Sequence, residues 1–417
     1  MNKKIGNIFK GDKGIWMVFL FLCLISIVEV FSASSSLTYK SQNYLTPIIG
    51  HSWKILTGVG VAILILNVPC RYFKLMTPIM LILSIMMLLW VLFLGEKTND
   101  AGRWINLGFV QFQPSEIAKG TLVLATAQIL SAMQREDGAD TRAFKYILMV
   151  VLPIVILIGL ENLSTAVLIM AVIFLMMFIG RVPFVQLGKL IAGGAVVVVL
   201  FIGLIFMAGS IEGSKTTETQ TETTTNGMTE KNSKKNVSFL HRFATWKNRI
   251  DKKLDSKYVA PEDYDLDKDA QVAHANIAIV NSNIIGKGPG QSIERDFLPQ
   301  AFSDFIFVII IEELGIIGAA FVVLLYIVLL FRAARIASRC ENNFPAFLIL
   351  GLTLMLVIQA TFNMLVAVGI APVTGQPLPL ISRGGTSTII NCAYIGAILS
   401  VSRSAKKREQ KMAVKEI

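Results

Sequence analysis

Charged residues are scarce in this sequence: Asp, Glu, Lys and Arg together make up 16% of its 417 residues, against about 25% in soluble domains. Hydrophobic residues make up 54%, and the mean hydropathy is +0.63. A chain with so few charged side chains could not cover its apolar surface in water, which excludes a soluble globular protein. We therefore interpret the chain as a membrane protein and count spans instead of soluble domains.

Cysteine and histidine are also rare. None of the four cysteines falls in a segment placed on the extracytoplasmic side, which excludes an extracytoplasmic disulfide framework. The three histidines, His51, His241 and His274, have no second histidine at ligand spacing. The sequence therefore predicts no structural metal site.

Apolar stretches long enough to cross a bilayer, roughly 20 residues each, recur along the chain. They lie near residues 14–33, 52–69, 73–94, 115–132, 144–160, 162–180, 186–209, 302–331, 344–369 and 385–403. The first has the basic and small flanking residues of a signal peptide, but its apolar run exceeds the usual length of about 7–15 residues, so we interpret it as an uncleaved helix. The predicted fold is an all-α polytopic membrane protein with about ten transmembrane helices.

The distribution of basic residues predicts the orientation. Short loops on the side of the two termini hold most of them, including Lys3, Lys4, Arg71, Lys74, Arg332 and Arg403, whereas the opposite short loops hold only Lys40, Lys97, Arg103 and Arg383. By the positive-inside rule, both termini are cytoplasmic. Much of the net charge of +11 therefore indicates orientation, and we expect no nucleic-acid partner.

The spans divide the chain into an ordered series of parts. We expect a cytoplasmic N-terminus at 1–13, helices one to seven at 14–209, a large extracytoplasmic loop at 210–301, helices eight to ten at 302–403 and a basic cytoplasmic tail at 404–417.

The large loop has two kinds of sequence. Residues 213–235 are rich in Thr, Glu, Lys and Asn, and we expect them to be disordered. Phe239, Phe243, Trp246 and Ile250 form a short amphipathic pattern, and residues 270–285 are typical of a further helix against the outer face.

Charged residues near spans are costly and are candidates for function. Glu116 and Lys119 are spaced i, i+3 on the fourth helix, which Pro114 begins, and Arg103 lies in the preceding outer loop. A structural ion pair explains the first two charges. A polar cavity wall that faces an anionic ligand explains all three.

The eighth helix carries three acids. Asp304 lies near its outer end, with Glu312 and Glu313 deeper. Helical geometry places Glu312 about 12 Å inward of Asp304, so that both could line one cavity. The alternatives are that Asp304 complements the helix dipole and that the two glutamates form interhelical hydrogen bonds.

Two glycine-rich segments on the outer side are further candidates. Lys287 lies in GKGPGQS, which is either a plain turn or a small anion-binding nest. Arg383 and Ser387 lie in TGQPLPLISRGGTS, which is either a re-entrant connection or a helix start with N–H donors facing outward.

Several motifs together resemble one family. The runs FSAS, GRWINLG, QPSEIAK, NSNIIGKGPGQS, LPQAFSDFIFVIIIEELGIIG and PVTGQPLPLISRGGTS occur in the order typical of the SEDS proteins (shape, elongation, division and sporulation), which are peptidoglycan glycosyltransferases. The last run is more similar to the cell-division branch, FtsW, than to the elongation branch, RodA.

The resemblance implies ten helices, a large loop between helices seven and eight, and lipid II as the substrate. It implies that Asp304 is essential for catalysis and that a class B penicillin-binding protein and other division proteins are partners. It also implies a place in the bacterial cytoplasmic (inner) membrane, at the division septum.

The sequence departs from the family pattern in three places. Residues 161–166 read ENLSTA where many relatives have PDLGTA, so that Asn162 replaces an acid. Arg383 stands where Tyr or Lys is usual, and the Thr- and Glu-rich insertion is unusual. A role for Asn162 is therefore not carried over.

The chemistry that we expect is inverting glycosyl transfer with Asp304 as the general base. Arg103, Lys119 and Arg383 are the candidates for countercharge to the leaving pyrophosphate, and a divalent cation, Mg²⁺ or Mn²⁺, stays open as a cofactor. The main alternative is a flippase or transporter of the lipid-linked precursor, although no internal repeat is visible. A scaffold that recruits a partner is a third possibility.

Overall fold

A computed structural model describes residues 10–34, 45–94, 96–98, 101–106, 111–196, 199, 203, 270–298 and 301–415. The chain forms two compact units, residues 1–183 with 265–417, and residues 184–264. In the second unit, the structure describes an apolar helix, Phe184–Val196, at the start of the expected span 186–209. The segment 213–235 and the pattern from Phe239 to Ile250 lie outside the described residues.

The first unit is a bundle of long helices. In chain order these are α2 (Lys13–Ala33), α4 (Leu45–Leu66), α5 (Cys70–Leu94), α6 (Pro114–Ala132), α7 (Thr141–Glu161), α8 (Leu163–Ile179), α12 (Ile306–Ala337), α13 (Asn343–Ala367) and α14 (Thr386–Lys415). Within the described ranges, six helices are long and apolar enough to cross a membrane. The prediction of a polytopic helical membrane protein is confirmed, with a helix at each expected span.

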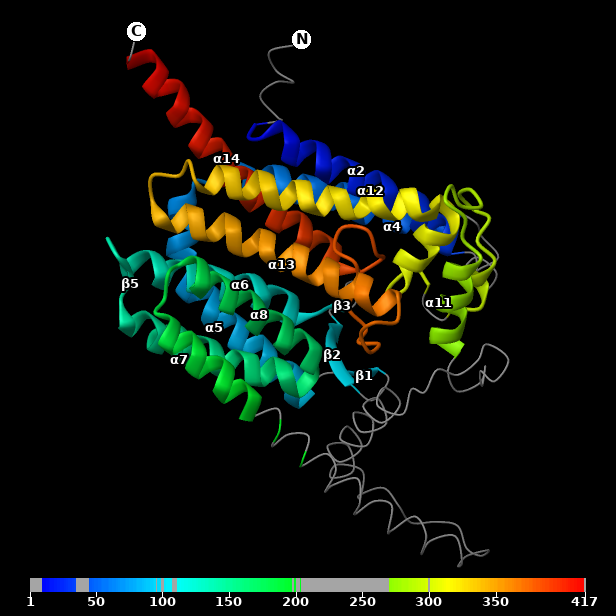
Figure 1. Ribbon diagram of the computed structural model, residues 1–417, viewed down its shortest axis with the longest axis horizontal. Helices are drawn as coiled ribbons and strands as arrows, with labels where there is room; N and C mark the ends of the chain where they lie inside the picture. The colour runs from blue at the N-terminus through cyan, green and yellow to red at the C-terminus, as the bar shows by residue number, and fades with distance from the viewer. Residues whose placement is uncertain are drawn as a thin grey trace, which may run out of the picture. The chain divides into compact units, whose positions relative to one another are not determined.

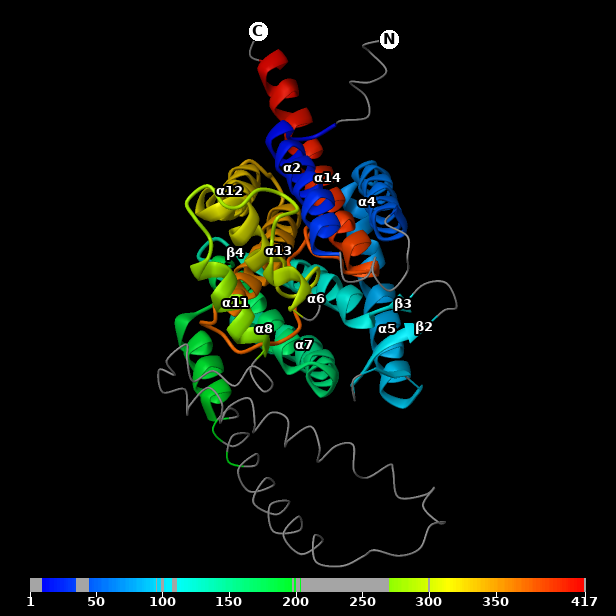
Figure 2. The same cartoon turned by 90° about the vertical axis from the view of Figure 1, so that its right-hand side faces the viewer.

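The long helices lie side by side, with α12 and α13 in mutual contact and α2 along α12 (Figure 1). The beginning of α2 and the end of α14 lie at the same end of this unit in both views (Figures 1 and 2). This arrangement agrees with two termini on one side of the membrane. We expected α14 to end at residue 403, but it continues to Lys415, because the basic tail is rich in helix formers and has no Gly or Pro.

Burial in this unit is the reverse of that in a soluble protein. Large apolar side chains are exposed on the outer faces, for example Leu64 at 71% and Phe93 at 77%. Lys119, Glu312 and Glu313 are fully buried at 0%. Apolar side chains thus face lipid and charged ones face the protein interior, as a bilayer requires.

Short strands connect some helices, and the sequence did not predict them. β1 (Glu96–Thr98), β2 (Ala101–Asn106) and β3 (Gln111–Phe112) form an antiparallel sheet in that order between α5 and α6. β4 (Gln134–Arg135) and β5 (Gly138–Ala139) form a second pair. Strands this short have too few residues for an alternating pattern to be visible.

The segment before α12 contains two short helices, α11 (Ala270–Val280) and η2 (Glu294–Asp296). The predicted helix at 270–285 was too long. The chain turns at Asn281, and Ser282 Oγ donates to Ile279 O at 2.7 Å, which closes the last turn locally.

Candidate active site

Asp304 lies just before α12, not within it. Phe305 is the N-cap residue and the helix begins at Ile306, four residues later than expected. The Asp304 side chain is half-buried, and Ser303 Oγ donates to its Oδ1 at 2.9 Å. Asn363 Nδ2 on α13 donates to Asp304 O at 2.8 Å. The Ser303 hydroxyl therefore orients the Asp304 carboxylate, and Asn363 of α13 holds the Asp304 backbone in place.

The segment 374–385 is held by buried side chains from three helices. Prolines prevent a regular helix here, so its carbonyl oxygens need other donors. These are Ser26 Oγ to Ile381 O (2.6 Å), Gln359 Nε2 to Pro377 O (3.1 Å), Asn363 Nδ2 to Gln376 O (2.7 Å) and Tyr326 OH to Pro379 O. The connection is therefore buried and fixed, which agrees with a re-entrant segment.

This segment packs directly on the residues that carry Asp304. Ser382 Oγ donates to Ser303 O at 2.6 Å, and Arg383 N donates to Phe302 O at 2.9 Å. The Arg383 guanidinium lies over the Phe302 ring, 5.4 Å from its centroid. The structure thus brings together two residues that are far apart in the sequence, Asp304 and Arg383, on adjacent backbone segments.

Arg383 has an incompletely compensated charge. Among the described residues, its Nη1 is buried without a hydrogen-bond partner. Burial lowers the pKa of Arg383, and two further basic residues, His51 and Lys54 of α4, lie within range of its charge. A half-buried cation beside further basic groups is an environment in which an anionic ligand is stabilised.

Sequence reasoning missed the contribution of α4. His51 Nε2 lies 2.8 Å from Ser26 Oγ, the hydroxyl that also bonds Ile381 O. Lys54 follows one turn later and is half-buried. The signal was present as i, i+3 spacing of two basic residues in an apolar run, but histidine was considered only as a metal ligand.

Glu116 and Lys119 form the ion pair that their spacing predicts. Their side chains are 2.8 Å apart and 3% and 0% exposed. Lys119 Nζ also donates to Gln359 Oε1 at 2.8 Å, and Gln359 in turn bonds Pro377 O. The lysine charge is therefore compensated within the chain, which favours the structural ion pair and links it to the 374–385 segment.

Two further residues of the predicted site are Arg103 and Ser387. Arg103 lies in β2, and its side chain is outside the described residues. Ser387 Oγ donates to Gly384 O at 2.5 Å, so this hydroxyl bonds its own helix start. Binding roles for both remain predictions.

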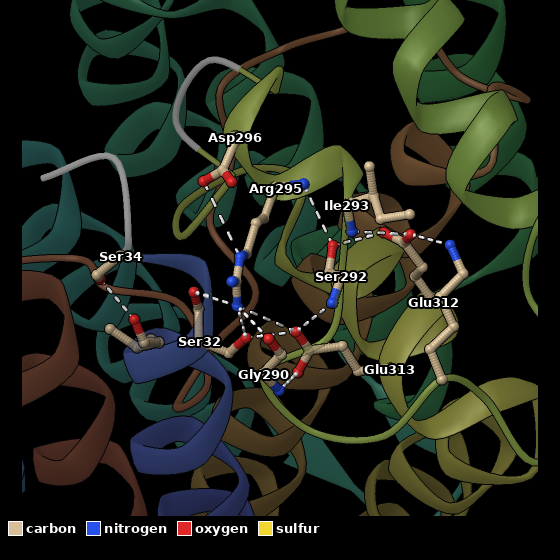
Figure 3. Close-up of polar contacts among 11 residues, drawn as sticks. Ser32, Ser34, Gly290, Ser292, Ile293, Arg295, Asp296, Glu312 and Glu313 are labelled. Carbon is tan, nitrogen blue, oxygen red and sulfur yellow. Dashed lines mark hydrogen bonds and ion pairs between the residues drawn. The ribbon is translucent and has the colours of Figure 1, made fainter. Parts of the chain in front are cut away.

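Glu312 binds the loop that precedes it, as Figure 3 shows. Its Oε1 accepts from Lys287 Nζ at 2.6 Å and from Ile293 N at 3.1 Å, and its Oε2 accepts from Ser292 Oγ at 2.5 Å. Loop donors thus take the place of the interhelical partners predicted for Glu312, whereas Glu313 does bond a second helix, through Ser32 Oγ of α2. Lys287 and Glu312 are paired with each other, so that their proposed roles toward a substrate remain predictions.

Glu313 binds the same loop from the other side (Figure 3). Its Oε2 accepts from Gly290 N at 2.9 Å, and its Oε1 accepts from Ser292 N at 3.2 Å and from Ser32 Oγ of α2. Two backbone donors that could form an anion nest, Gly290 N and Ser292 N, are therefore occupied by a carboxylate of the chain itself. We call the loop 286–293 with Glu312 and Glu313 the carboxylate clamp.

A kink in α12 makes the carboxylate clamp possible. Gly315 has φ 69° and ψ −173° inside the helix, a conformation that favours glycine. The carbonyls of Glu312 and Glu313, released from the helix, accept from Lys287 N at 3.0 Å and Gly288 N at 2.8 Å. The kink thus joins the loop to α12 through main-chain as well as side-chain bonds.

We expect Gly286→Ala to destabilise the protein by roughly 3 kcal/mol or more. A Cβ at Gly286 would lie 2.3 Å from Glu313 O and 2.4 Å from Gly315 N, so the backbone must move. Gly290→Ala is the matched control, because Gly290 also has positive φ (82°) but open space around it, and it should cost only about 1–2 kcal/mol. Thermal unfolding of the purified proteins measures both, and equal losses would contradict the clamp.

One buried acid, Glu29, was not among the predicted site residues. Glu29 on α2 is fully buried, and among the described residues both its carboxylate oxygens lack a hydrogen-bond partner. Sequence reasoning overlooked it, although a lone acid in an apolar span is a recognised signal.

The residues that depart from the family pattern lie at the junction of α7 and α8. Glu161 is the last residue of α7. Asn162 caps α8, because its side chain accepts a hydrogen bond from Thr165 N at 3.4 Å.

The structure is that of a polytopic helical membrane protein whose buried charged side chains, such as Lys119, Glu312 and Glu313, lie inside the helical bundle. The sequence matches the FTSW_RODA_SPOVE family, described as cell cycle protein, over residues 12–225 and 235–407. The chain belongs to this family, and the resemblance inferred from the motifs is confirmed.

Relatives from both branches are similar over nearly the whole chain. The probable peptidoglycan glycosyltransferase FtsW of Hahella chejuensis is 30% identical over 399 residues, covering 94% of this chain and 90% of the relative. The peptidoglycan glycosyltransferase MrdB of Escherichia coli K12 is 26% identical over 397 residues, covering 95% and 94%.

Two solved structures share the fold. One comes from work on the structural coordination of polymerization and crosslinking by a peptidoglycan synthase complex, with a TM-score of 0.69, 24% identity and coverage of 95% of this chain and 99% of that chain. The other is the rod shape determining protein RodA of Thermus thermophilus, with a TM-score of 0.61, 23% identity and coverage of 95% and 98%.

Proposed function

We propose that this protein is a peptidoglycan glycosyltransferase that polymerises lipid II into glycan strands during septal cell-wall synthesis. Its family membership and the names of its relatives support the activity. The observation that carries the proposal is the packing of segment 374–385, with Arg383, on the backbone of Phe302 and Ser303, next to Asp304. A reaction on a sugar pyrophosphate needs both a base and a cation, and these adjacent backbone segments carry one of each.

In the proposed reaction, Asp304 accepts the proton of the acceptor sugar 4-hydroxyl. The acceptor oxygen forms a bond to the anomeric carbon of the donor, and the bond from that carbon to the pyrophosphate breaks. Undecaprenyl pyrophosphate leaves with the electron pair, and the anomeric configuration inverts. The Ser303 hydroxyl, which donates to Asp304 Oδ1, orients the base and is a positioning residue.

The leaving pyrophosphate gains negative charge that the protein must stabilise. Arg383 and Lys54 are the described groups best suited to this, because Lys119 is already bound by Glu116 and Gln359. Arg103 stays a candidate from the sequence. A Mg²⁺ or Mn²⁺ ion would have to take most of its oxygen ligands from the substrate phosphates, because the described part of the chain has no group of three or more His, Cys, Asp or Glu side chains that could hold a metal ion.

We expect Arg383→Gln to lower the rate of polymerisation about 10²-fold, because one stabilising cation is lost. Arg383→Lys should keep most of the activity, since it keeps the charge. Lys54→Gln should show a smaller loss, about 10-fold, for the same reason. Initial rates with labelled lipid II measure all three, with Lys74→Gln on an exposed position of α5 as the control. A wild-type rate for Arg383→Gln would exclude this role.

The partner and the branch belong to the same proposal. A class B penicillin-binding protein would crosslink the strands that this chain makes, and other division proteins would recruit it to the septum of the inner membrane. The elongation branch is the alternative, since relatives from both branches are similar to the chain. A fluorescent fusion at midcell supports the division role, whereas one along the sidewall supports elongation.

A further inference from the structure

A pocket lies at the end of the first unit opposite to Asp304. It has a volume of about 230 Å³ and lies where α2 begins and where α12 and the buried part of α14 end. The part of α12 from the kink at Gly315 to Ile336 alone is about 30 Å long, and Asp304 lies beyond the other side of that kink, so the pocket is far from Asp304. The proposed reaction does not use it.

Basic side chains dominate the lining of this pocket. Lys13, Arg332 and Arg339 line it together with a single carboxylate, Asp12. Asp12 already binds Arg332 through both oxygens, Oδ1 to Nε at 3.0 Å and Oδ2 to Nη2 at 2.5 Å. Its Oδ1 also accepts from Ile15 N at 3.1 Å as the cap of α2. The pocket therefore carries an excess of positive charge over its one fully engaged acid.

The rest of the lining suits a molecule with a polar and an apolar part. Ser402 contributes a hydroxyl, whereas Ile336 and Ala405 contribute apolar surface. The pocket lies where α2 begins, where α12 ends and where the buried part of α14 ends, on the side expected to be cytoplasmic and at the level of the lipid headgroups. Basic pockets between helices on that side bind the phosphates of anionic lipids, and the inner leaflet supplies such lipids.

We propose that this pocket binds the headgroup of an anionic glycerophospholipid of the inner leaflet. The phosphate lies against Lys13 and Arg339, the Ser402 hydroxyl donates to it, and the glycerol backbone contacts Ile336 and Ala405. Arg332, held by Asp12, forms the fixed wall of the site. The bound lipid would join the beginning of α2, the end of α12 and the part of α14 around Ser402.

Native mass spectrometry of the full chain released from nanodiscs tests this proposal. In nanodiscs of phosphatidylcholine with phosphatidylglycerol, the wild-type protein should retain phosphatidylglycerol at least about 5-fold over its share of the bilayer. The variant Lys13→Gln/Arg339→Gln should lose this preference. The control Arg71→Gln/Lys74→Gln, on exposed positions of the same expected face, should keep it.

A second variant separates the pocket from the general charge of this face. Ala405→Leu fills the pocket and leaves every charge in place, so it should also lose the preference. Retention of the lipid by Ala405→Leu, or equal loss in both double variants, would overturn the proposal in favour of general attraction to a basic surface. Displacement of the lipid by millimolar inorganic phosphate would also overturn it, since the ligand would then be a soluble anion.

Discussion

Asp304→Asn is expected to lower the polymerisation of lipid II by about 10²–10⁴-fold, the contribution typical of a general base. Asparagine has nearly the same shape, and its Oδ1 can still accept from Ser303 Oγ, the bond that holds the aspartate. It cannot accept the proton of the sugar hydroxyl. The measurement is the yield of glycan chains from labelled lipid II with purified protein and a class B penicillin-binding protein, the proposed partner.

Asp296→Asn is the matched control for this variant. Asp296 is an exposed acid in the same loop between α11 and α12, with its side chain 55% exposed. It should polymerise lipid II at the wild-type rate. If Asp304→Asn also keeps that rate, Asp304 is not the base. In cells, the Asp304→Asn protein also tests the scaffold alternative, because a scaffold would still support division.

Lys119→Met is expected to give the largest loss of stability, about 3–5 kcal/mol. Lys119 is fully buried, and Glu116 beside it has one carboxylate oxygen, Oε2, that is buried without a hydrogen-bond partner among the described residues. Removal of the lysine leaves a buried negative charge without compensation. Gln359 Oε1 also loses its donor.

The double variant Glu116→Gln/Lys119→Met provides the control, because it removes both charges at once. It should recover most of the lost stability, since a neutral pair avoids the unpaired charge. The midpoint of thermal unfolding in detergent measures each variant. An unchanged midpoint for Lys119→Met would contradict the structural ion pair. If the double variant is stable but inactive, the pair has a further role in the reaction.

Local features of the fold could be predicted from the sequence. Apolar runs identified the helices, and Pro114 identified the beginning of α6 because proline suits the first turn. The i, i+3 spacing predicted the ion pair between Glu116 and Lys119. Each of these follows from residues within one or two turns of each other.

Contacts between distant parts of the chain could not be predicted in this way. Ser32 and Glu313 are separated by 281 residues and yet bond each other, and no local pattern encodes such a pair. The kink at Gly315 is equally invisible, because a single glycine in a helix is common, and only the clamp explains its conformation. The bond between Glu312 and Lys287 could not be predicted either, because it joins α12 to a loop 25 residues earlier.

The paired carboxylates of α6 and α12 argue against the transporter alternative. A translocation path needs polar groups that can exchange partners with a substrate. The buried carboxylates of α6 and α12 instead bind residues of the chain, Glu116 with Lys119 and Glu312 with Lys287. These pairs favour a fixed interior with chemistry at one surface.

The most direct measurement of the proposed activity uses purified wild-type protein in vesicles with a class B penicillin-binding protein and labelled lipid II. Glycan strands and undecaprenyl pyrophosphate should form together, and neither should form with the Asp304→Asn protein. Movement of intact lipid II between leaflets without any strands would contradict polymerisation and identify a flippase.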